Sequence, residues 1–384
     1  MHEESKYLKC EHMHRDPKLA TNKTDGHQLF LNEIENFPEA DIYVQYLCTS
    51  PFLKEETIDK AIRLLKEHPE HDSVILMKKD KVYGWSDGQP TYDINHIPNS
   101  KDLPFTITES MALYVIRKET ALKLRRRFGD NPLFVYATPL EYLDVNLPED
   151  FEAAEIIAEG FRAQEVRHLN LLKHFISSPI LSDIIDDFEA EKGITVGHVL
   201  PGFQCNIGNS VIFGRAKTLA LRPLEPGENF EGIYDALHSY ESITNGDIIV
   251  VANKLPQYAY FGDLNTRLAI RSGASGVIVN SVTRDLDRVK LFNLPVFSRG
   301  RNAADVRRRA TVESINQEIF IAEASIRPGD FIFADADAVV VLKEEFFEDI
   351  TKIAMEKINQ EHRVSLGIMK QQHSDQLLQE NGGF

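Results

Sequence analysis

A chain of 384 residues exceeds what one hydrophobic core ordinarily organises, so two domains are expected. Its 42% hydrophobic and 27% charged residues are typical of a soluble globular protein, and its net charge of −16 argues against a broad nucleic-acid-binding surface, which needs clustered Lys and Arg. No apolar run reaches the ~18–20 residues that span a bilayer, and residues 1–16 are too charged for a signal peptide, so we expect a cytoplasmic protein with no membrane partner.

The first half of the chain alternates predicted strands and helices. After a polar run to Gly26, residues 28–37 are amphipathic, and residues 87–104 form a long loop rich in Pro, Asn and Asp. Strands are predicted at 42–47, 73–78, 112–117 and 142–145, and helices at 57–65 and 119–127. This alternation predicts an α/β domain with a mainly parallel sheet.

A long or kinked helix is predicted to join the halves and to fix them relative to each other, because apolar residues recur at helical spacing over residues 149–176. The next helix is predicted to begin with Ser178 as N-cap and Pro179 at its first position. Short strands are predicted at 210–213, 218–221, 247–252, 276–280, 331–333 and 339–342. The amphipathic segment 344–358 predicts a C-terminal helix, and a frayed tail is expected beyond Gln371.

The segment from Tyr258 to Asp285 carries the pattern most relevant to function. A strand at 247–252, a helix at 264–272 ended by Gly273, and a strand at 276–282 form a strand–helix–strand unit. This unit places Gly262 at the helix N-terminus and Arg284 and Asp285 just past the carboxyl end of a strand. Both positions lie on the rim of the sheet where open α/β folds bind ligands.

Each of these residues has a chemical role that suits an oxo acid. Free N–H groups at the helix start bind anions, Gly262 allows close approach, and Arg284 can hold a carboxylate through two hydrogen bonds. Asp263 and Asp285 are hard oxygen donors suited to Mg²⁺ or Mn²⁺, which would stabilise an enolate as a C–C bond breaks. The same residues also have a structural interpretation, as a surface ion pair, a helix cap and a turn glycine.

From about residue 177 to 345 the chain resembles the RraA-like superfamily, which includes the class II 4-hydroxy-4-methyl-2-oxoglutarate aldolases and the regulators of ribonuclease activity. The signature is an acidic residue after Gly, then twenty residues, then Arg-Asp; here residues 264–283 separate Asp263 from Arg284. Supporting matches are Leu181-Ser182-Asp183, Gly273-Ala274-Ser275-Gly276-Val277-Ile278-Val279, Leu294-Pro295-Val296-Phe297-Ser298-Arg299-Gly300, Pro328-Gly329-Asp330 and Ala334-Asp335-Ala336-Asp337.

The resemblance implies a role for each site residue. Arg284 and the backbone of Gly262, Asp263, Leu264 and Asn265 would bind pyruvate, Asp285 would anchor the metal, and Asp263 would orient the metal's water ligands. The sequence departs from the family at Asn280-Ser281, where Asp-Gly is usual, and at Ala338, where Gly is usual. Active members often borrow an acidic side chain from a neighbouring subunit, for which Glu361 is a candidate. The family also implies a homo-oligomer, a trimer or hexamer.

From about residue 15 to 161 the chain resembles the later part of CMP-sialic acid synthetases and related sugar-acid cytidylyltransferases. The matching residues are Tyr46-Leu47-Cys48-Thr49-Ser50-Pro51-Phe52, Ala112-Leu113-Tyr114-Val115, Tyr142-Leu143-Asp144-Val145-Asn146 and Glu149-Asp150-Phe151-Glu152-Ala153-Ala154-Glu155. The family's phosphate-binding loop does not precede Arg15, and Asn146 replaces the second Asp of its metal pair. Nucleotidyl transfer is therefore not expected of this chain alone; the half is expected to be either truncated upstream or a scaffold.

Other clusters of chemically active residues have structural interpretations. Arg299, Arg301, Arg307, Arg308 and Arg309 are interpreted as a solvated helix face rather than an anion or RNA site, and the thirteen histidines have no metal-ligand spacing. The three cysteines, Cys10, Cys48 and Cys205, lie far apart and indicate neither a zinc site nor a disulfide framework.

The predicted organisation is a partial nucleotidyltransferase-like α/β domain at residues 1–160, a connecting helix at 161–176, an RraA-like α/β domain at 177–345, and a helix and tail at 346–384. The leading hypothesis is a metal-dependent lyase that cleaves a 4-hydroxy-2-oxo acid or decarboxylates an oxo-diacid, releasing pyruvate. A sialic-acid-type sugar in its open-chain form would be such a substrate. The alternatives are a sugar-acid cytidylyltransferase with an accessory RraA-like domain and a non-catalytic regulatory binding protein.

Overall fold

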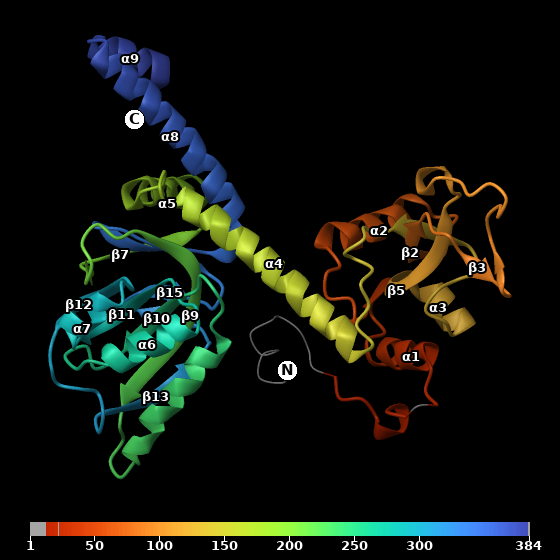
Figure 1. Cartoon of the computed structure of the whole chain (residues 1–384), viewed down its shortest axis with the longest axis horizontal. Helices are drawn as coiled ribbons and strands as arrows, with labels where there is room; N and C mark the ends of the chain where they lie inside the picture. The colour runs from red at the N-terminus through yellow and green to blue at the C-terminus, as the bar shows by residue number, and fades with distance from the viewer. Residues whose placement is uncertain (1–12, 22, 383–384) are drawn as a thin grey trace. The chain divides into compact units, whose positions relative to one another are not determined.

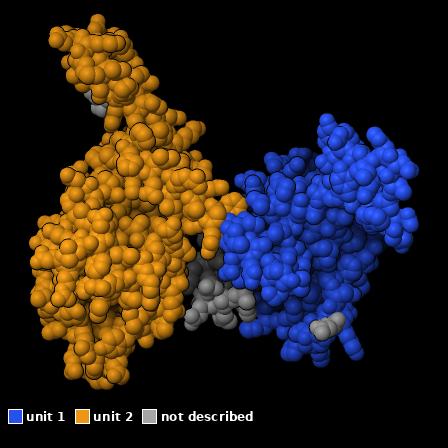
Figure 2. Space-filling model, viewed as in Figure 1, with its two compact units in different colours: residues 1–158 blue, residues 159–384 orange. Residues whose placement is uncertain are grey.

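The computed structural model describes residues 13–21 and 23–382, so Cys10 lies outside the described residues. The chain divides into two compact units, residues 1–158 and 159–384, which Figure 2 colours separately. The division falls within helix α4 (Pro148–Leu172), at the segment where one long helix was predicted. Among the described residues, no helix combines the length and apolar character that crossing a membrane requires.

The first unit is a four-stranded sheet with helices on its faces (Figure 1). Helix α1 (Gly26–Asn36) begins at Asp25 because the Asp25 carboxylate caps the first turn while Gln28 reaches back to the Asp25 N–H. The hydrophobic core of the first unit lies in two clusters, one beneath α2 and one beneath α1 and α3. Its other elements are η2 (Pro17–Leu19), β1 (Ile42–Tyr46), α2 (Glu55–Glu67), β2 (Ser73–Asp80), β3 (Trp85–Ser86), β4 (Gln89–Pro90), η3 (Ser100–Asp102), β5 (Thr106–Arg117), α3 (Lys118–Leu124) and β6 (Pro132–Tyr136).

The prediction of a mainly parallel sheet is wrong for this unit. The strand order is β1-β5-β2-β6, and only β2 and β6 run parallel. The strand predicted at 142–145 is not formed; β6 supplies the fourth strand instead. Strand β6 begins at Pro132, a position that tolerates proline because the first residue of a strand need not donate to the ladder.

The second unit is a mixed α/β structure around a nine-stranded sheet. Strands β9, β10, β11 and β12 are parallel, and all other strand pairings in this sheet are antiparallel. Its elements are α5 (Ser178–Lys192), β7 (Gly197–Pro201), β8 (Gln204–Cys205), β9 (Ile212–Pro223), η4 (Phe230–Ser242), β10 (Ile248–Asn253), α6 (Asp263–Arg271), β11 (Gly276–Thr283), α7 (Leu286–Leu291), β12 (Val296–Arg301), β13 (Ala310–Ile315), β14 (Ile319–Ile321), β15 (Ala324–Ile326), β16 (Phe331–Ala334), β17 (Ala338–Leu342), η5 (Glu344–Phe346), α8 (Phe347–Met369) and α9 (Ser374–Asn381).

Several details differ from the sequence-based expectations. The strands predicted at 210–213 and 218–221 are one continuous strand, β9. Ser177, not Ser178, is the N-cap of α5, and the Asp335 carboxylate accepts hydrogen bonds from the backbone N–H and hydroxyl of Ser178 at 2.9 and 2.7 Å. The part of the tail beyond Gln371 that the structure describes, residues 372–382, is not frayed: residues 374–381 form α9, whose Leu377 is buried.

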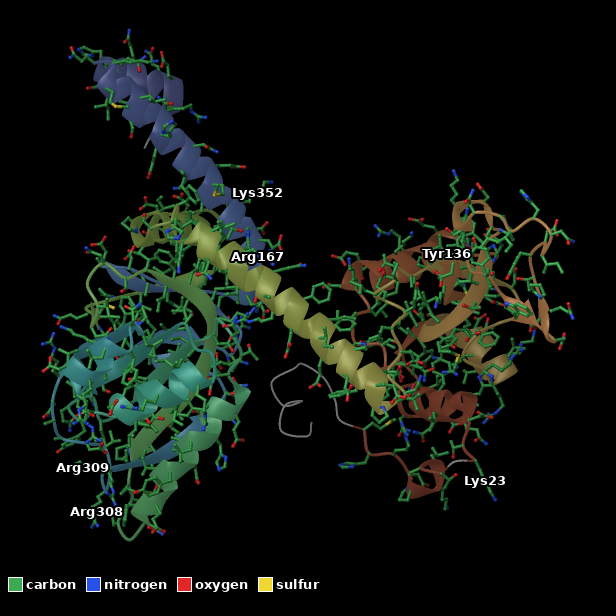
Figure 3. The ribbon with its side chains drawn as sticks, viewed as in Figure 1. Lys23, Tyr136, Arg167, Arg308, Arg309 and Lys352 are labelled. Atoms are coloured by element: carbon green, nitrogen blue, oxygen red, sulfur yellow. The ribbon has the colours of Figure 1, made fainter. Side chains whose placement is uncertain are left out.

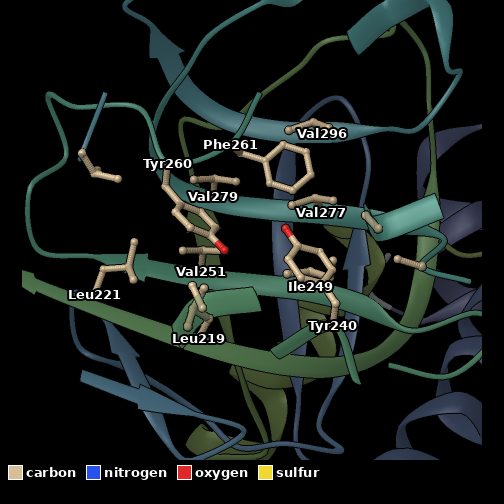
Figure 4. Packing of buried hydrophobic residues seen from close by; sticks show 14 of the residues in the cluster. Leu219, Leu221, Tyr240, Ile249, Val251, Tyr260, Phe261, Val277, Val279 and Val296 are labelled. Atoms are coloured by element: carbon tan, nitrogen blue, oxygen red, sulfur yellow. The ribbon is translucent and has the colours of Figure 1, made fainter. Parts of the chain in front are cut away.

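Three apolar clusters hold the second unit together. One lies between the parallel strands and the layer formed by η4, α6 and α7, and Figure 4 shows Tyr240 and Tyr260 lying over Ile249, Val251 and Val277 in this cluster. A second fills the face closed by β14 and β15, and the third lies beneath α4, α5 and α8. The first cluster matters most for the site, because it holds α6 and α7 against the parallel strands with the N-termini of both helices at the carboxyl ends of those strands.

Candidate functional site

Three connections meet at the carboxyl edge of the parallel strands. Strand β10 leads to α6 through Gly262, β11 ends at Thr283 directly before Arg284 and Asp285, and the segment after β12 carries Asp305. Because β10, β11 and β12 are parallel, these connections share one edge. Residues Ala259 and Asp305 form an isolated parallel bridge that ties the first connection to the third. The predicted placement of Gly262 and the Arg284–Asp285 pair on one rim is confirmed.

Asp263 is buried and its carboxylate already contacts two guanidinium groups. Its side chain lies at the first position of α6, and the residue is 8% exposed. Its Oδ1 accepts a hydrogen bond from Arg267 Nε at 3.1 Å, and its Oδ2 lies 3.7 Å from Arg288 Nη1. Asp263 is therefore positioned on the rim as predicted, but both of its oxygens contact cationic partners.

Arg284 is held by two carboxylates. Its Nη1 lies 2.8 Å from Asp305 Oδ2 and its Nε lies 3.7 Å from Asp285 Oδ2, while its backbone N–H donates to the Phe261 carbonyl at 3.2 Å. A guanidinium carries five N–H donors, so the end of Arg284 that bears Nη2 keeps donors for a ligand carboxylate. The side chain is 37% exposed, which leaves it accessible to solutes.

Asp285 stands in an unusual backbone conformation at the start of α7. Its φ of 56° lies in the left-handed region, which costs a non-glycine residue about 1 kcal/mol. This conformation turns its carboxylate toward α6, where Oδ2 accepts a hydrogen bond from the Asp263 N–H at 3.3 Å. The negative charge thus lies against the positive end of the α6 dipole.

Gly262 is required by the closeness of Asp285 rather than by its own backbone angles, since its φ of −162° is ordinary extended backbone. A Cβ at residue 262 would lie 2.7 Å from Asp285 Oδ2 and 3.1 Å from Arg284 Cγ. From the sequence, Gly262 was expected to allow the close approach of a ligand. In the structure its missing side chain makes room for the two neighbouring site residues.

The first turn of α6 offers backbone donors to the same space. The N-cap residue, Gly262, has no side chain to cap this helix, and Asp285 accepts only from the Asp263 N–H. Within residues 13–21 and 23–382 the N–H groups of Leu264 and Asn265 donate to no protein acceptor. The Asn265 side chain instead bonds to the Tyr260 carbonyl at 2.7 Å, which fixes the loop before the helix. Such N–H groups at a helix start favour an anion.

The six predicted site residues line one cavity of about 680 Å³: Gly262, Asp263, Leu264, Asn265, Arg284 and Asp285. Its wall includes Tyr260, where burial raises the pKa of the phenol to about 12 and keeps the hydroxyl protonated. Sequence reasoning missed Asp305 and Arg288, and it missed the wall formed by η4. Asp305 was not predicted because it lies inside the arginine-rich segment 299–309, which was interpreted from its basic residues alone.

The residues present fit a divalent cation in part. Asp285 offers a half-exposed carboxylate at the cavity, and its contact with Arg284 is 3.7 Å long, whereas Asp263 and Asp305 form closer ion pairs with arginines at 3.1 and 2.8 Å. Within the part of the chain that the structure describes, no three His, Cys, Asp or Glu side chains come together as a metal-binding group. A cation here would take Asp285 and water as ligands. Glu361, the candidate acid from a neighbouring subunit, lies exposed on α8.

The basic cluster does not form the predicted helix face. Arg299 and Arg301 belong to β12, and the other three residues occupy the turn before β13, where Figure 3 labels Arg308 and Arg309. Several of these guanidinium groups pack on aromatic rings: Arg299 over Phe203 at 3.8 Å, Arg308 over Phe230 at 4.7 Å and Arg309 over Tyr258 at 4.5 Å. Cation–π packing explains their position without a nucleic-acid ligand.

In the first unit, the two residues matched to a cytidylyltransferase metal pair bind each other. The Asn146 side chain donates a hydrogen bond to Asp144 Oδ2 at 2.7 Å in the segment before α4. The family and relatives described next support no cytidylyltransferase, so that resemblance stays a prediction.

Comparison with known proteins agrees with the geometry of the second unit. Residues 178–341 match the RraA-like family, described as Aldolase/RraA. The chain is 26% identical over 185 residues to Protein DlpA of Legionella pneumophila, covering 47% of this chain and 29% of that protein. It is 29% identical over 150 residues to a Halalkalibacterium halodurans protein named "Putative 4-hydroxy-4-methyl-2-oxoglutarate aldolase", covering 39% of this chain and 68% of that protein.

A crystal structure of an uncharacterized protein from Pseudomonas syringae pv. tomato aligns with 56% of this chain and 94% of its own, at 24% identity and a TM-score of 0.48. The chain thus spans less than a third of DlpA and about two thirds of the aldolase-named protein. Residues 178–341 of this chain are thus similar to the RraA-like family.

Proposed function

We propose that the second unit is a divalent-metal-dependent lyase that releases pyruvate, either by retro-aldol cleavage of a 4-hydroxy-2-oxo acid or by decarboxylation of an oxo-diacid. The observation that carries the proposal is the convergence of the α6 N-terminus, Arg284 and Asp285 on one cavity. The aldolase name of a relative at 29% identity supports the same reaction class.

Substrate binding would begin with the carboxylate. The remaining donors of Arg284 and the N–H groups of Leu264 and Asn265 line the same cavity. A substrate carboxylate can therefore accept hydrogen bonds from the guanidinium on one side and from the start of α6 on the other. Asp305 acts as a positioning residue, since its 2.8 Å ion pair keeps the Arg284 guanidinium turned toward the cavity.

In the retro-aldol step, solvent water accepts the 4-hydroxyl proton, C4 becomes the carbonyl carbon of the second product, and the C3–C4 bond breaks. The electron pair of that bond forms an enolate, whose C3 then takes a proton from solvent to give pyruvate and whose negative charge develops on the 2-oxo oxygen. A divalent cation held by Asp285 would supply Lewis-acid stabilisation for that oxygen. Asp263 would contribute through water molecules rather than directly, because Arg267 and Arg288 already contact both of its carboxylate oxygens. The Arg284 guanidinium would stabilise negative charge that develops beside the bound carboxylate.

One observation favours a second candidate function, that of a non-catalytic binding protein. The ion pair between Arg284 and Asp305 neutralises the main anion-binding group of the cavity in the absence of a ligand. Under this alternative the cavity arginines and acids only stabilise the rim, and oxo acids do not bind.

Pyruvate release tests the choice between the two. The full chain is incubated with Mg²⁺ or Mn²⁺ and a panel of 4-hydroxy-2-oxo acids and oxaloacetate, and pyruvate is followed with a coupled dehydrogenase. We expect release that depends on the added cation and falls at least about 100-fold in Arg284→Ala. Arg271→Ala, an exposed arginine at the other end of α6, is the matched control. Equal rates in wild type and Arg284→Ala across the panel would reject the lyase.

A further inference from the structure

One wall of the site cavity is apolar. Helix η4 contributes four residues, and none of its charged side chains lines the cavity. Helix α6 adds Leu264 and Leu268. The four residues from η4 are Ile233, Tyr234, Ala236 and Leu237.

Several of these side chains remain unusually exposed for their size. Tyr234 is 47% exposed, Leu237 is 49% exposed and Leu264 is 73% exposed. When a ligand covers large apolar groups that border a cavity and contact water, their removal from water makes the binding free energy more favourable. The occupant belongs to the same cavity as Arg284, because both groups line it.

The basic groups of the cavity already have partners. Arg284 pairs with Asp305 at 2.8 Å, and Arg288 lies 3.7 Å from Asp263. The third, Arg307, packs its guanidinium over the Phe230 ring at 5.8 Å. These contacts leave some guanidinium donors free, so what distinguishes the η4 side of the cavity is its apolar lining rather than its basic groups. A polyhydroxylated sugar chain would find one hydrogen-bonding side chain on the η4 wall, that of Tyr234.

We propose that the substrate carries an apolar alkyl or aryl group on the carbon chain beyond its 2-oxo acid end, and that η4 and α6 form the subsite for this group. The inference rests on the proposed function, since it takes the Arg284 end of the cavity as the oxo-acid site. Of the two proposed reactions it favours retro-aldol cleavage, because a simple oxo-diacid has no apolar group to occupy this subsite. Tyr234 and Leu237 are then specificity-determining residues that touch the substituent but not the reacting atoms.

Binding of 2-oxo acids that lack the 4-hydroxyl group tests the subsite without turnover. Titration calorimetry of the full chain with Mg²⁺ compares pyruvate, 2-oxo-4-phenylbutanoate and 2-oxoglutarate. We expect the phenyl compound to bind about tenfold more tightly than pyruvate, as partial burial of one ring warrants. In Leu237→Asp and Tyr234→Ser this ratio should fall toward one. Leu291→Asp, which changes an exposed leucine of α7 outside the cavity, should keep the ratio.

The possible failures are distinct. If none of the three acids binds, the oxo-acid site itself is wrong, and the proposed function fails together with the subsite. If pyruvate binds but the phenyl compound binds no better, or if 2-oxoglutarate binds most tightly, the apolar subsite is wrong and the lyase proposal stands. A tenfold ratio that survives both Leu237→Asp and Tyr234→Ser would also overturn the assignment to η4.

Discussion

Replacing Gly262 by alanine should disrupt the candidate site while leaving the fold intact. The backbone of Gly262 is extended, so alanine adds no conformational strain. The new Cβ would lie 2.7 Å from Asp285 Oδ2, where ordinary contact begins at 3.4 Å, so the carboxylate must move by about 0.7 Å. Asp285 can move, because its side chain is 41% exposed.

The displacement has a predictable energetic cost. It breaks the hydrogen bond from the Asp263 N–H to Asp285, which is already 3.3 Å long, and moves a negative charge away from the N-terminus of α6. We expect a loss of about 1 kcal/mol in the free energy of unfolding, which lowers the Tm of a domain of this size by about 2–4 °C. Affinity for pyruvate with Mg²⁺ should fall more, by about tenfold to 100-fold, because misplacement of this size is costly at a binding site.

Differential scanning calorimetry measures the Tm, and titration calorimetry measures the affinity for pyruvate with Mg²⁺, on the same samples. Gly208→Ala is the matched control, since a Cβ at residue 208 would have no neighbour within 4 Å. Wild-type affinity in Gly262→Ala would refute the argument that Asp285 and its neighbours must sit where they do for binding.

Three further predictions concern the second unit. Arg284→Lys keeps the charge but loses the planar pair of donors. Calorimetry should find the affinity for oxo acids reduced about tenfold and the Tm unchanged. A loss of Tm equal to that of Gly262→Ala would contradict this prediction. Gly214→Ala would place a Cβ 2.4 Å from a backbone carbonyl oxygen, so urea unfolding should report a loss of about 1–3 kcal/mol; an unchanged midpoint would show that the sheet can adjust. Burial raises the pKa of Asp335, but hydrogen bonds from Ser178 and two further backbone N–H groups outweigh it and lower the pKa below its usual value. A lowered carboxyl pKa stabilises the fold above the unfolded pKa and loses this effect as the pH falls through the folded value, so Asp335→Asn should be less stable than wild type near pH 7, and the difference should shrink toward pH 3; a constant difference would refute this role.

The rim of the second unit could be predicted from sequence because its signals are local. Gly273, with a φ of +89°, ends α6 as expected, and the apolar runs of β10 and β11 define the strands on either side. Once two parallel strands flank a helix, the positions of Gly262 and Arg284 follow from chain connectivity. Local patterns of this kind need no knowledge of distant contacts.

What escaped prediction depends on long-range pairing. Strand β5 of the first unit pairs antiparallel with both β1 and β2, and alternation of strands and helices does not encode that direction. Asp305 becomes a site residue only because a backbone bridge brings its segment beside Ala259. The η4 wall likewise joins the site through packing across the sheet, since Tyr234 has no motif of its own.

The central claim is that the α6 N-terminus, Arg284 and Asp285 hold a 2-oxo acid together. A crystal structure of the full chain soaked with pyruvate and Mg²⁺ tests it most directly. The account predicts a pyruvate carboxylate within hydrogen-bonding distance of Arg284 and of the Leu264 or Asn265 N–H, with the cation bound to Asp285. Pyruvate bound elsewhere, or absent from this cavity at saturating concentration, would contradict the claim.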